Sequence, residues 1–205
     1  MTPKVKVCGV TDAAFAAAAA QRGVDCLGVI FAARSPRRVT QKQAQAIAQA
    51  ARAARPVAPP RIVGVFVEQT ACEIAVLAAA VPLDVVQLHG AYGASDVAAL
   101  KAKGLEVWRL HDGADAHADA ALLDGQVGKR RGGTGQLADW SLVAGLKRQG
   151  RRVVLAGGLS SANIAAAAAT GADILDVNSS LETAPGVKSI ELLDALLGEL
   201  NKERP

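Results

Sequence analysis

Aromatic residues are scarce in this chain of 205 residues, where Phe, Trp and Tyr together make up 3% of the sequence. Because the hydrophobic fraction is nevertheless 51%, the core must be built mainly from Ala, Val and Leu. Such side chains suit parallel strands that pack tightly beneath Ala-rich helices. The length allows one sizeable core, whereas two domains would each be small. We therefore expect residues 1–205 to form a single α/β domain.

Long apolar segments and paired cysteines are also missing. No run of about 18 apolar residues lacks charges, and the start at Met1 has no signal-type hydrophobic segment, which argues against a membrane or secreted protein. We expect a cytoplasmic location. Cys8, Cys26 and Cys72 are odd in number and lack metal-ligand spacing, so the sequence predicts reduced thiols and no metal site.

Charge of one sign is not concentrated in a single stripe of the sequence. The formal net charge of +4 favours an anionic small molecule as partner, but Lys and Arg are scattered rather than arranged in a stripe. We therefore expect no nucleic-acid partner. A solvated basic surface with no binding role explains the same net charge equally well.

Eight short runs rich in β-branched residues alternate with Ala-rich stretches, a pattern typical of crossover units in a parallel sheet. The alternation predicts a small (β/α)₈ TIM barrel. A doubly wound open sheet is the alternative, but it usually carries a glycine fingerprint after its first strand, where this chain has Cys8-Gly9-Val10-Thr11. We expect the eight strands at residues 4–10, 26–31, 61–67, 85–89, 106–111, 121–124, 152–156 and 174–178.

Ala-rich segments between these strands predict the helices, because Ala has the highest helix propensity. Between residues 111 and 121 the chain is short and rich in Asp and Ala, so helix 5 should be short or missing. The helices are expected at residues 12–22, 41–55, 70–80, 95–103, 142–149, 161–170 and 189–202.

Polar residues collect where the expected strands end, which is the face that carries the active site in TIM barrels. Period-two alternation places Lys6 and Cys8 on the inner face of the first strand. A buried lysine needs a partner, for which Asp176 and Asp124 are both candidates. The other polar residues and glycines at strand ends are Gln87, His89, Gly157, Gly158, Asn178, Ser179 and Ser180.

Each candidate also has a structural interpretation. Cys8 can be a small buried hydrophobe, although a following glycine, a helix start and nearby cations would favour its thiolate. Asp124 can simply cap a loop, and Arg37 can be a solvated turn residue instead of a carboxylate clamp. The glycines around Gly133 can bring backbone amides to a ligand or only form turns. Gly157 and Gly158 fit the phosphate loops of a barrel, or a tight turn.

Taken in order from Lys6 to Lys188, these segments resemble the phosphoribosylanthranilate isomerase family of tryptophan biosynthesis. No single piece is specific, but the ordered set is. The pieces are Lys6-Val7-Cys8-Gly9-Val10-Thr11, Ser35-Pro36-Arg37, Val63-Gly64-Val65-Phe66-Val67, Gln87-Leu88-His89-Gly90, Leu123-Asp124, Gly132-Gly133-Thr134-Gly135, Leu155-Ala156-Gly157-Gly158-Leu159, Asp176-Val177, Glu182 and Pro185-Gly186-Val187-Lys188.

The resemblance implies a TIM barrel that carries out an Amadori rearrangement of N-(5-phosphoribosyl)anthranilate without a metal or organic cofactor. Cys8 matches the family's general base, Asp124 its general acid, and Arg37 the residue that holds the anthranilate carboxylate. Asp176 matches an aspartate that contacts the sugar, while Gln87 and His89 belong to a barrel-mouth motif without an assigned role. The remaining expected substrate-binding residues are Gly133, Gly157, Gly158, Ser179 and Ser180.

The sequence departs from the family pattern at one loop, and it is compatible with two alternative functions. Asn178-Ser179-Ser180 stands where the family has Ser-Ser-Gly, which affects the expected phosphate geometry. A barrel that binds a phosphate metabolite without turnover is one alternative. A histidine-pathway phosphoribosyl isomerase is the other, although it would have an aspartate at the position of Cys8. We expect a monomer or a homodimer.

Overall fold

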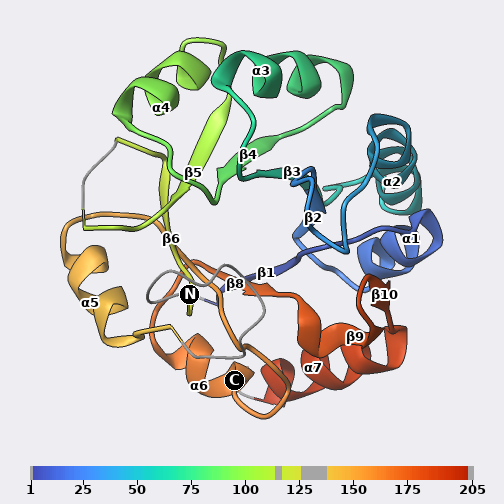
Figure 1. Ribbon diagram of the computed structural model, residues 1–205. Helices are drawn as coiled ribbons and strands as arrows, with labels where there is room; N and C mark the ends of the chain where they lie inside the picture. The colour runs from blue at the N-terminus through green and yellow to red at the C-terminus, as the bar shows by residue number, and fades with distance from the viewer. Residues whose placement is uncertain (1, 114–116, 126–137, 203–205) are drawn as a thin grey trace.

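The computed structural model describes residues 2–113, 117–125 and 138–202. Eight parallel strands close into a barrel in chain order, and β8 completes the ring by pairing with β1 (Figure 1). The TIM-barrel prediction is therefore confirmed. The strands are β1 (Lys4–Val7), β2 (Cys26–Ile30), β3 (Arg61–Phe66), β4 (Val85–Leu88), β5 (Glu106–Leu110), β6 (Ala120–Leu123), β7 (Val153–Leu155) and β8 (Ile174–Val177).

Helices form a ring outside the barrel (Figure 1). Side-chain caps set several of their starts: the Asp12 carboxylate accepts from the backbone of α1, and Thr40 with Gln43 and Thr70 with Glu73 form capping boxes on α2 and α3. The helices are α1 (Ala13–Gln21), α2 (Gln41–Ala54), α3 (Ala71–Ala80), α4 (Ala94–Lys101), α5 (Ser141–Arg148), α6 (Ile164–Ala169) and α7 (Ile190–Lys202).

The two faces of the barrel wall bury different sets of side chains, as the period-two pattern requires. Val5 and Val7 of β1 belong to the large cluster between strands and helices. A second cluster, to which Cys26 and Trp108 belong, fills the barrel interior. Lys6, between the two valines, points inward and is completely buried.

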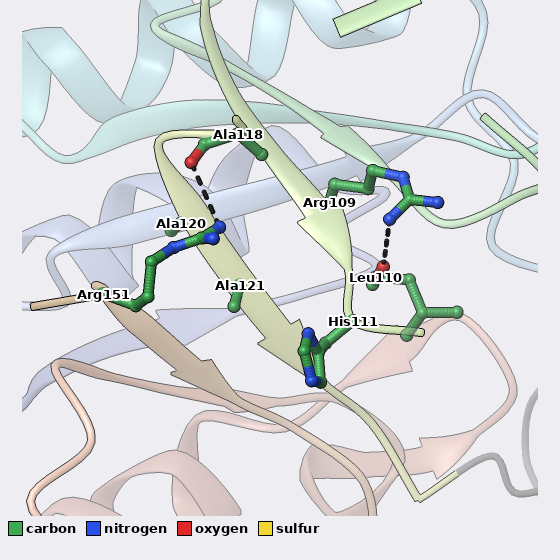
Figure 2. A pocket seen from close by; sticks show the side chains of 7 residues that line it. All are labelled: Arg109, Leu110, His111, Ala118, Ala120, Ala121 and Arg151. Atoms are coloured by element: carbon green, nitrogen blue, oxygen red, sulfur yellow. Dashed lines mark hydrogen bonds between the residues drawn. The ribbon is translucent and has the colours of Figure 1, made fainter. Parts of the chain in front are cut away.

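No helix occurs among the described residues between β5 and β6, so the expectation for helix 5 is confirmed. Figure 2 shows a small pocket on this side of the barrel, lined in part by Arg109 and Arg151. Arg109 donates to the Leu110 carbonyl at 3.3 Å and Arg151 to the Ala118 carbonyl at 3.4 Å. The pocket contains none of the expected site residues.

Three short elements after β8 were not expected from the sequence. A 3₁₀ turn, η1 (Ser179–Leu181), leads into an antiparallel hairpin of β9 (Glu182–Ala184) and β10 (Val187–Lys188). Gly186 sits in its turn with a φ of +84°. Figure 1 places the hairpin beside α1 and α7. In the described part of the chain, no helix is long and apolar enough to cross a membrane.

Candidate active site

The strands end earlier than expected, and the polar residues lie just beyond them in the loops. Cys8 follows β1, His89 follows β4 and Asp124 follows β6. The backbone of Cys8 still donates to Val177 at 2.8 Å, and that of His89 donates to Phe66 at 2.8 Å. These bonds extend the barrel wall by one residue and hold the side chains at its carboxyl-end mouth.

An ion pair between Lys6 and Asp176 lies inside the barrel beneath this mouth. The Lys6 ammonium donates to Oδ2 of Asp176 at 2.7 Å, and the side chains are 0% and 6% exposed. Of the two carboxylates considered from sequence, Asp176 is therefore the partner of Lys6. Burial raises the pKa of the Asp176 carboxyl, while attraction to Lys6 opposes the rise. Its Oδ1 atom is buried without a hydrogen-bond partner, so it is available to a ligand hydroxyl.

Cys8 is buried beside this pair. A Cβ atom added at Gly28 would meet the Cys8 sulfur at 2.9 Å and the Lys6 nitrogen at 3.1 Å, so only glycine leaves room for both groups. Burial raises the pKa of the Cys8 thiol, and the positive charges of Lys6 and Lys188 oppose that rise. The cations act in the direction expected from the sequence, but desolvation of the thiolate outweighs them, so the net shift of the Cys8 pKa is upward.

Asp124 is paired with His89 across the mouth. Nε2 of His89 lies 3.2 Å from Oδ2 of Asp124, and both side chains are about one-fifth exposed, at 17% and 21%. Gly157, with a φ of +82°, packs against the loop after β6 that carries Asp124 and Gly125. A Cβ atom at Gly157 would lie 2.2 Å from the Gly125 nitrogen. The imidazole therefore orients the carboxyl, and a glycine is required to let β7's loop approach it.

Arg37 is already held by a carboxylate of the chain itself. Its Nε and Nη2 atoms donate to the two carboxylate oxygens of Glu182 at 2.8 and 2.7 Å. Glu182 was quoted from the sequence only as part of the family resemblance, without a role. Opposite charges on the two sides of a Pro-Gly turn, at Glu182 and Lys188, are the sequence signal that could have indicated this cluster.

The expected phosphate loops lie next to each other after β7 and β8. Gly157 and Gly158 both have positive φ, at +82° and +66°, so the tight turn that formed the alternative interpretation exists. Ser180 donates its hydroxyl hydrogen to the Leu159 carbonyl at 2.6 Å. This bond ties the two loops together and leaves Ser179, rather than Ser180, with a free hydroxyl donor in the described structure.

Two further expected residues have different outcomes. Gln87 is 2% exposed within the barrel wall, between Val65 and Trp108 on the neighbouring strands, and its Oε1 atom has no hydrogen-bond partner. Gly133 lies outside the described residues. Within the described ranges, no group of three or more His, Cys, Asp or Glu side chains could hold a metal ion.

Electrostatic contact joins these groups into one site. The negative charge of Asp176 raises the pKa of the Cys8 thiol. The pKa of the Asp176 carboxyl is in turn raised by the charge of Asp124 and lowered by that of His89. A buried thiol and a carboxyl therefore lie on the same mouth, with Arg37 and the glycine turns of the last loops near them. Fold and site together define the class of TIM-barrel enzymes, with a carboxyl-end mouth whose groups are suited to acid–base chemistry on a small anionic molecule.

Comparison with known proteins identifies the family within this class. The chain belongs to the N-(5′-phosphoribosyl)anthranilate isomerase family, whose model matches residues 5–199. A relative of that name from Pseudomonas paraeruginosa is 39% identical over 197 residues, covering 90% of this chain and 89% of its own.

Solved structures agree with this assignment. The phosphoribosyl anthranilate isomerase of Thermus thermophilus has a TM-score of 0.86 at 34% identity, covering 98% of this chain and all of its own. Another phosphoribosyl anthranilate isomerase, in complex with reduced 1-(o-carboxyphenylamino)-1-deoxyribulose 5-phosphate, has a TM-score of 0.80 at 25% identity. That match covers 98% of this chain and 99% of that chain.

Proposed function

We propose that this protein converts N-(5′-phosphoribosyl)anthranilate to 1-(2-carboxyphenylamino)-1-deoxyribulose 5-phosphate, an Amadori rearrangement in tryptophan biosynthesis. Family membership supports the reaction. The observation that carries the assignment of residues is the placement of Cys8 and Asp124 directly after β1 and β6, at the same carboxyl-end mouth of the closed barrel. An acid and a base on either side of one sugar are what the reaction needs.

Asp124 is the general acid in this proposal. Its carboxyl gives a proton to the furanose ring oxygen, and the bond between that oxygen and C1′ breaks to leave an open-chain protonated Schiff base. His89, 3.2 Å from Oδ2, orients the carboxyl and can return a proton to it.

Cys8 is the general base. As a thiolate it removes the proton from C2′, the electron pair moves toward the nitrogen, and the resulting enamine tautomerises to the ketone of the product. Lys6 and Lys188 supply the positive charge that favours the thiolate in a buried position. The net reaction needs no oxidant and consumes no proton.

Substrate binding uses groups around the acid and the base. Arg37 holds the anthranilate carboxylate, and Gly157, Gly158 and Ser179 hold the phosphate through amide and hydroxyl donors. Asp176 accepts a sugar hydroxyl at its unpaired Oδ1 atom. Gln87 of β4 offers a second buried acceptor, its unpaired Oε1 atom.

The test is a fluorescence assay of the purified protein with freshly prepared phosphoribosylanthranilate. The wild type should turn the substrate over, and Cys8→Ala should lose several powers of ten in kcat, because the base acts in the transition state. Cys72→Ala is the matched control, since Cys72 is an exposed cysteine outside the site. Binding of the substrate without turnover by the wild type would instead support the non-catalytic barrel.

The remaining expectations form part of the same proposal. We propose that residues 1–205 act as one domain, that the protein works in the cytoplasm, and that it is a monomer or homodimer with no nucleic-acid partner. A single cooperative unfolding transition tests whether the chain is one domain. A mass from light scattering tests whether it is a monomer or a homodimer.

A further inference from the structure

The guanidinium of Arg37 has two edges that can each bind a carboxylate in bidentate fashion. Glu182 occupies the edge formed by Nε and Nη2. Among the described residues, none accepts a hydrogen bond from Nη1, so the second edge is open. Arg37 can therefore keep its bond to Glu182 while it binds an external carboxylate.

A neutral Arg37–Glu182 pair would attract such a carboxylate only weakly, and Lys188 changes this balance. Its ammonium donates to Oε1 of Glu182 at 2.8 Å, and the Lys188 and Glu182 side chains are 1% and 4% exposed. The cluster of Arg37, Glu182 and Lys188 therefore carries one net positive charge. Since two of its members are almost completely desolvated, that charge is weakly screened.

Lys188 also connects this cluster to the loop after β8. The same ammonium donates to the backbone carbonyl and to Oδ1 of Asn178, each at 2.8 Å, so all three of its hydrogens are used. Asn178 directly precedes Ser179 of the expected phosphate loop. It is also one of the two residues, with Ser180, that depart from the family's Ser-Ser-Gly pattern, and its amide oxygen accepts a hydrogen bond from Lys188.

The hairpin that supplies Glu182 and Lys188 is anchored over the first two barrel loops. Thr11 donates to the Gly186 carbonyl at 2.6 Å, after β1. Gly9 lies between Arg37 and Asn178, where an added Cβ would meet the Arg37 Cδ at 2.6 Å and the Asn178 Oδ1 at 2.9 Å. The loop that carries Cys8 is thus packed directly against the charged cluster.

We propose that the β9–β10 hairpin is a positioning element for substrate specificity, in which Glu182 orients Arg37 and Lys188 restores the net positive charge needed to select a carboxylated substrate. Neither residue touches the substrate in this arrangement. The inference rests on the proposed function, because it takes Arg37 as the binding site of the anthranilate carboxylate.

The experiment measures dissociation constants by calorimetry for two ligands that differ in one group. One is reduced 1-(o-carboxyphenylamino)-1-deoxyribulose 5-phosphate, and the other is the same compound without the carboxylate. Lys188→Met should weaken binding of the carboxylated ligand by about tenfold, because it removes the net positive charge of the cluster. Glu182→Gln should weaken it by a similar factor for a different reason: the charge of the cluster increases, but Arg37 loses the bidentate partner that orients its open edge. The ligand without the carboxylate should bind within about twofold of wild type, since it has nothing to place on Arg37.

Control variants separate this role from a merely structural one. Val187→Ala shortens an exposed side chain of the same hairpin and should bind both ligands as wild type does. Lys188→Arg keeps the charge and should retain most of the selectivity even if Lys188→Met is too unstable to measure.

Equal weakening of both ligands in the Glu182 and Lys188 variants, or no weakening of either, overturns the inference. A wild type that isomerises phosphoribosylanthranilate but binds the two ligands equally well also overturns it, while leaving the proposed function intact. A wild type without turnover counts against the proposed function itself.

Discussion

Nζ of Lys6 lies 2.7 Å from Oδ2 of Asp176, and neither side chain is more than 6% exposed. The two residues are neighbours in the register of β1 and β8, the strands that close the barrel. Their ion pair therefore joins the first strand to the last while it places a positive charge beside Cys8. A single contact contributes to closure of the fold and to the electrostatics of the site.

Lys6→Met should destabilise the protein strongly, by roughly 3–5 kcal/mol, because it leaves Asp176 buried without its partner. Urea unfolding followed by circular dichroism measures this. The double variant Lys6→Met/Asp176→Leu should recover much of the loss, since it removes both buried charges. A double variant that is no more stable than Lys6→Met would show that the cost does not come from the unpaired carboxylate.

Alkylation of Cys8 should require more alkaline pH than an ordinary thiol. Burial raises its pKa, so the reactive thiolate fraction is small near neutral pH and increases as the pH rises through and beyond 9.0, the ordinary value. The rate of reaction with iodoacetamide against pH measures this in a Cys72→Ala background, because Cys72 is exposed. Cys26, whose pKa is raised to about 11, would react over the same alkaline range, so the background also carries Cys26→Ala. If the rate reaches half its maximum at a lower pH than for a free cysteine peptide, the pKa of Cys8 is lowered rather than raised, and the assigned direction is wrong.

Asp124→Asn should lower kcat by about 10²–10⁴-fold with little change in KM, because an amide cannot donate the proton that opens the ring. His89→Asn should have a smaller effect, about tenfold, since it removes only the partner that orients the carboxyl. Steady-state kinetics measure both. Asp194→Asn, at an exposed position on α7, is the control. Wild-type kcat in Asp124→Asn would remove this residue from the acid role.

Arg37→Ala should raise KM by about 10–100-fold while kcat changes less, because the anthranilate carboxylate loses its charged partner. Arg22→Ala is the matched control, since Arg22 forms a solvent-exposed ion pair with Asp194 away from the site. If Arg37→Ala and Arg22→Ala have the same KM as wild type, the carboxylate binds elsewhere.

Much of the fold could be predicted because it depends on local pattern. The eight β-branched runs became the eight barrel strands, and the Asp- and Ala-rich segment after β5 has no helix among its described residues. The expected strands ran too far at several carboxyl ends. Val10 and His89 continue the apolar or alternating pattern, but the regular strands end at Val7 and Leu88. Beyond these residues only single backbone hydrogen bonds, such as that from His89 to Phe66, continue the barrel wall into the mouth.

The hairpin of β9 and β10 shows the opposite case. Its strands have three and two residues, which is too short for periodicity to indicate pairing. Glu182 and Lys188 have their roles only because the hairpin folds back onto Arg37 and Asn178. A sequence reading treats such residues as ordinary surface charges, since the contacts that bury them join distant parts of the chain.

By itself, the sequence determined the barrel, the inward direction of Lys6 and Cys8, and the placement of Cys8, His89 and Asp124 where strands end, because alternation and strand boundaries are local properties. Tertiary structure alone decided that Asp176 rather than Asp124 pairs with Lys6, that His89 pairs with Asp124, and that burial outweighs the cations around Cys8. Desolvation and ion pairing depend on the distances between groups that lie far apart in the chain, and those distances exist only once the barrel has closed.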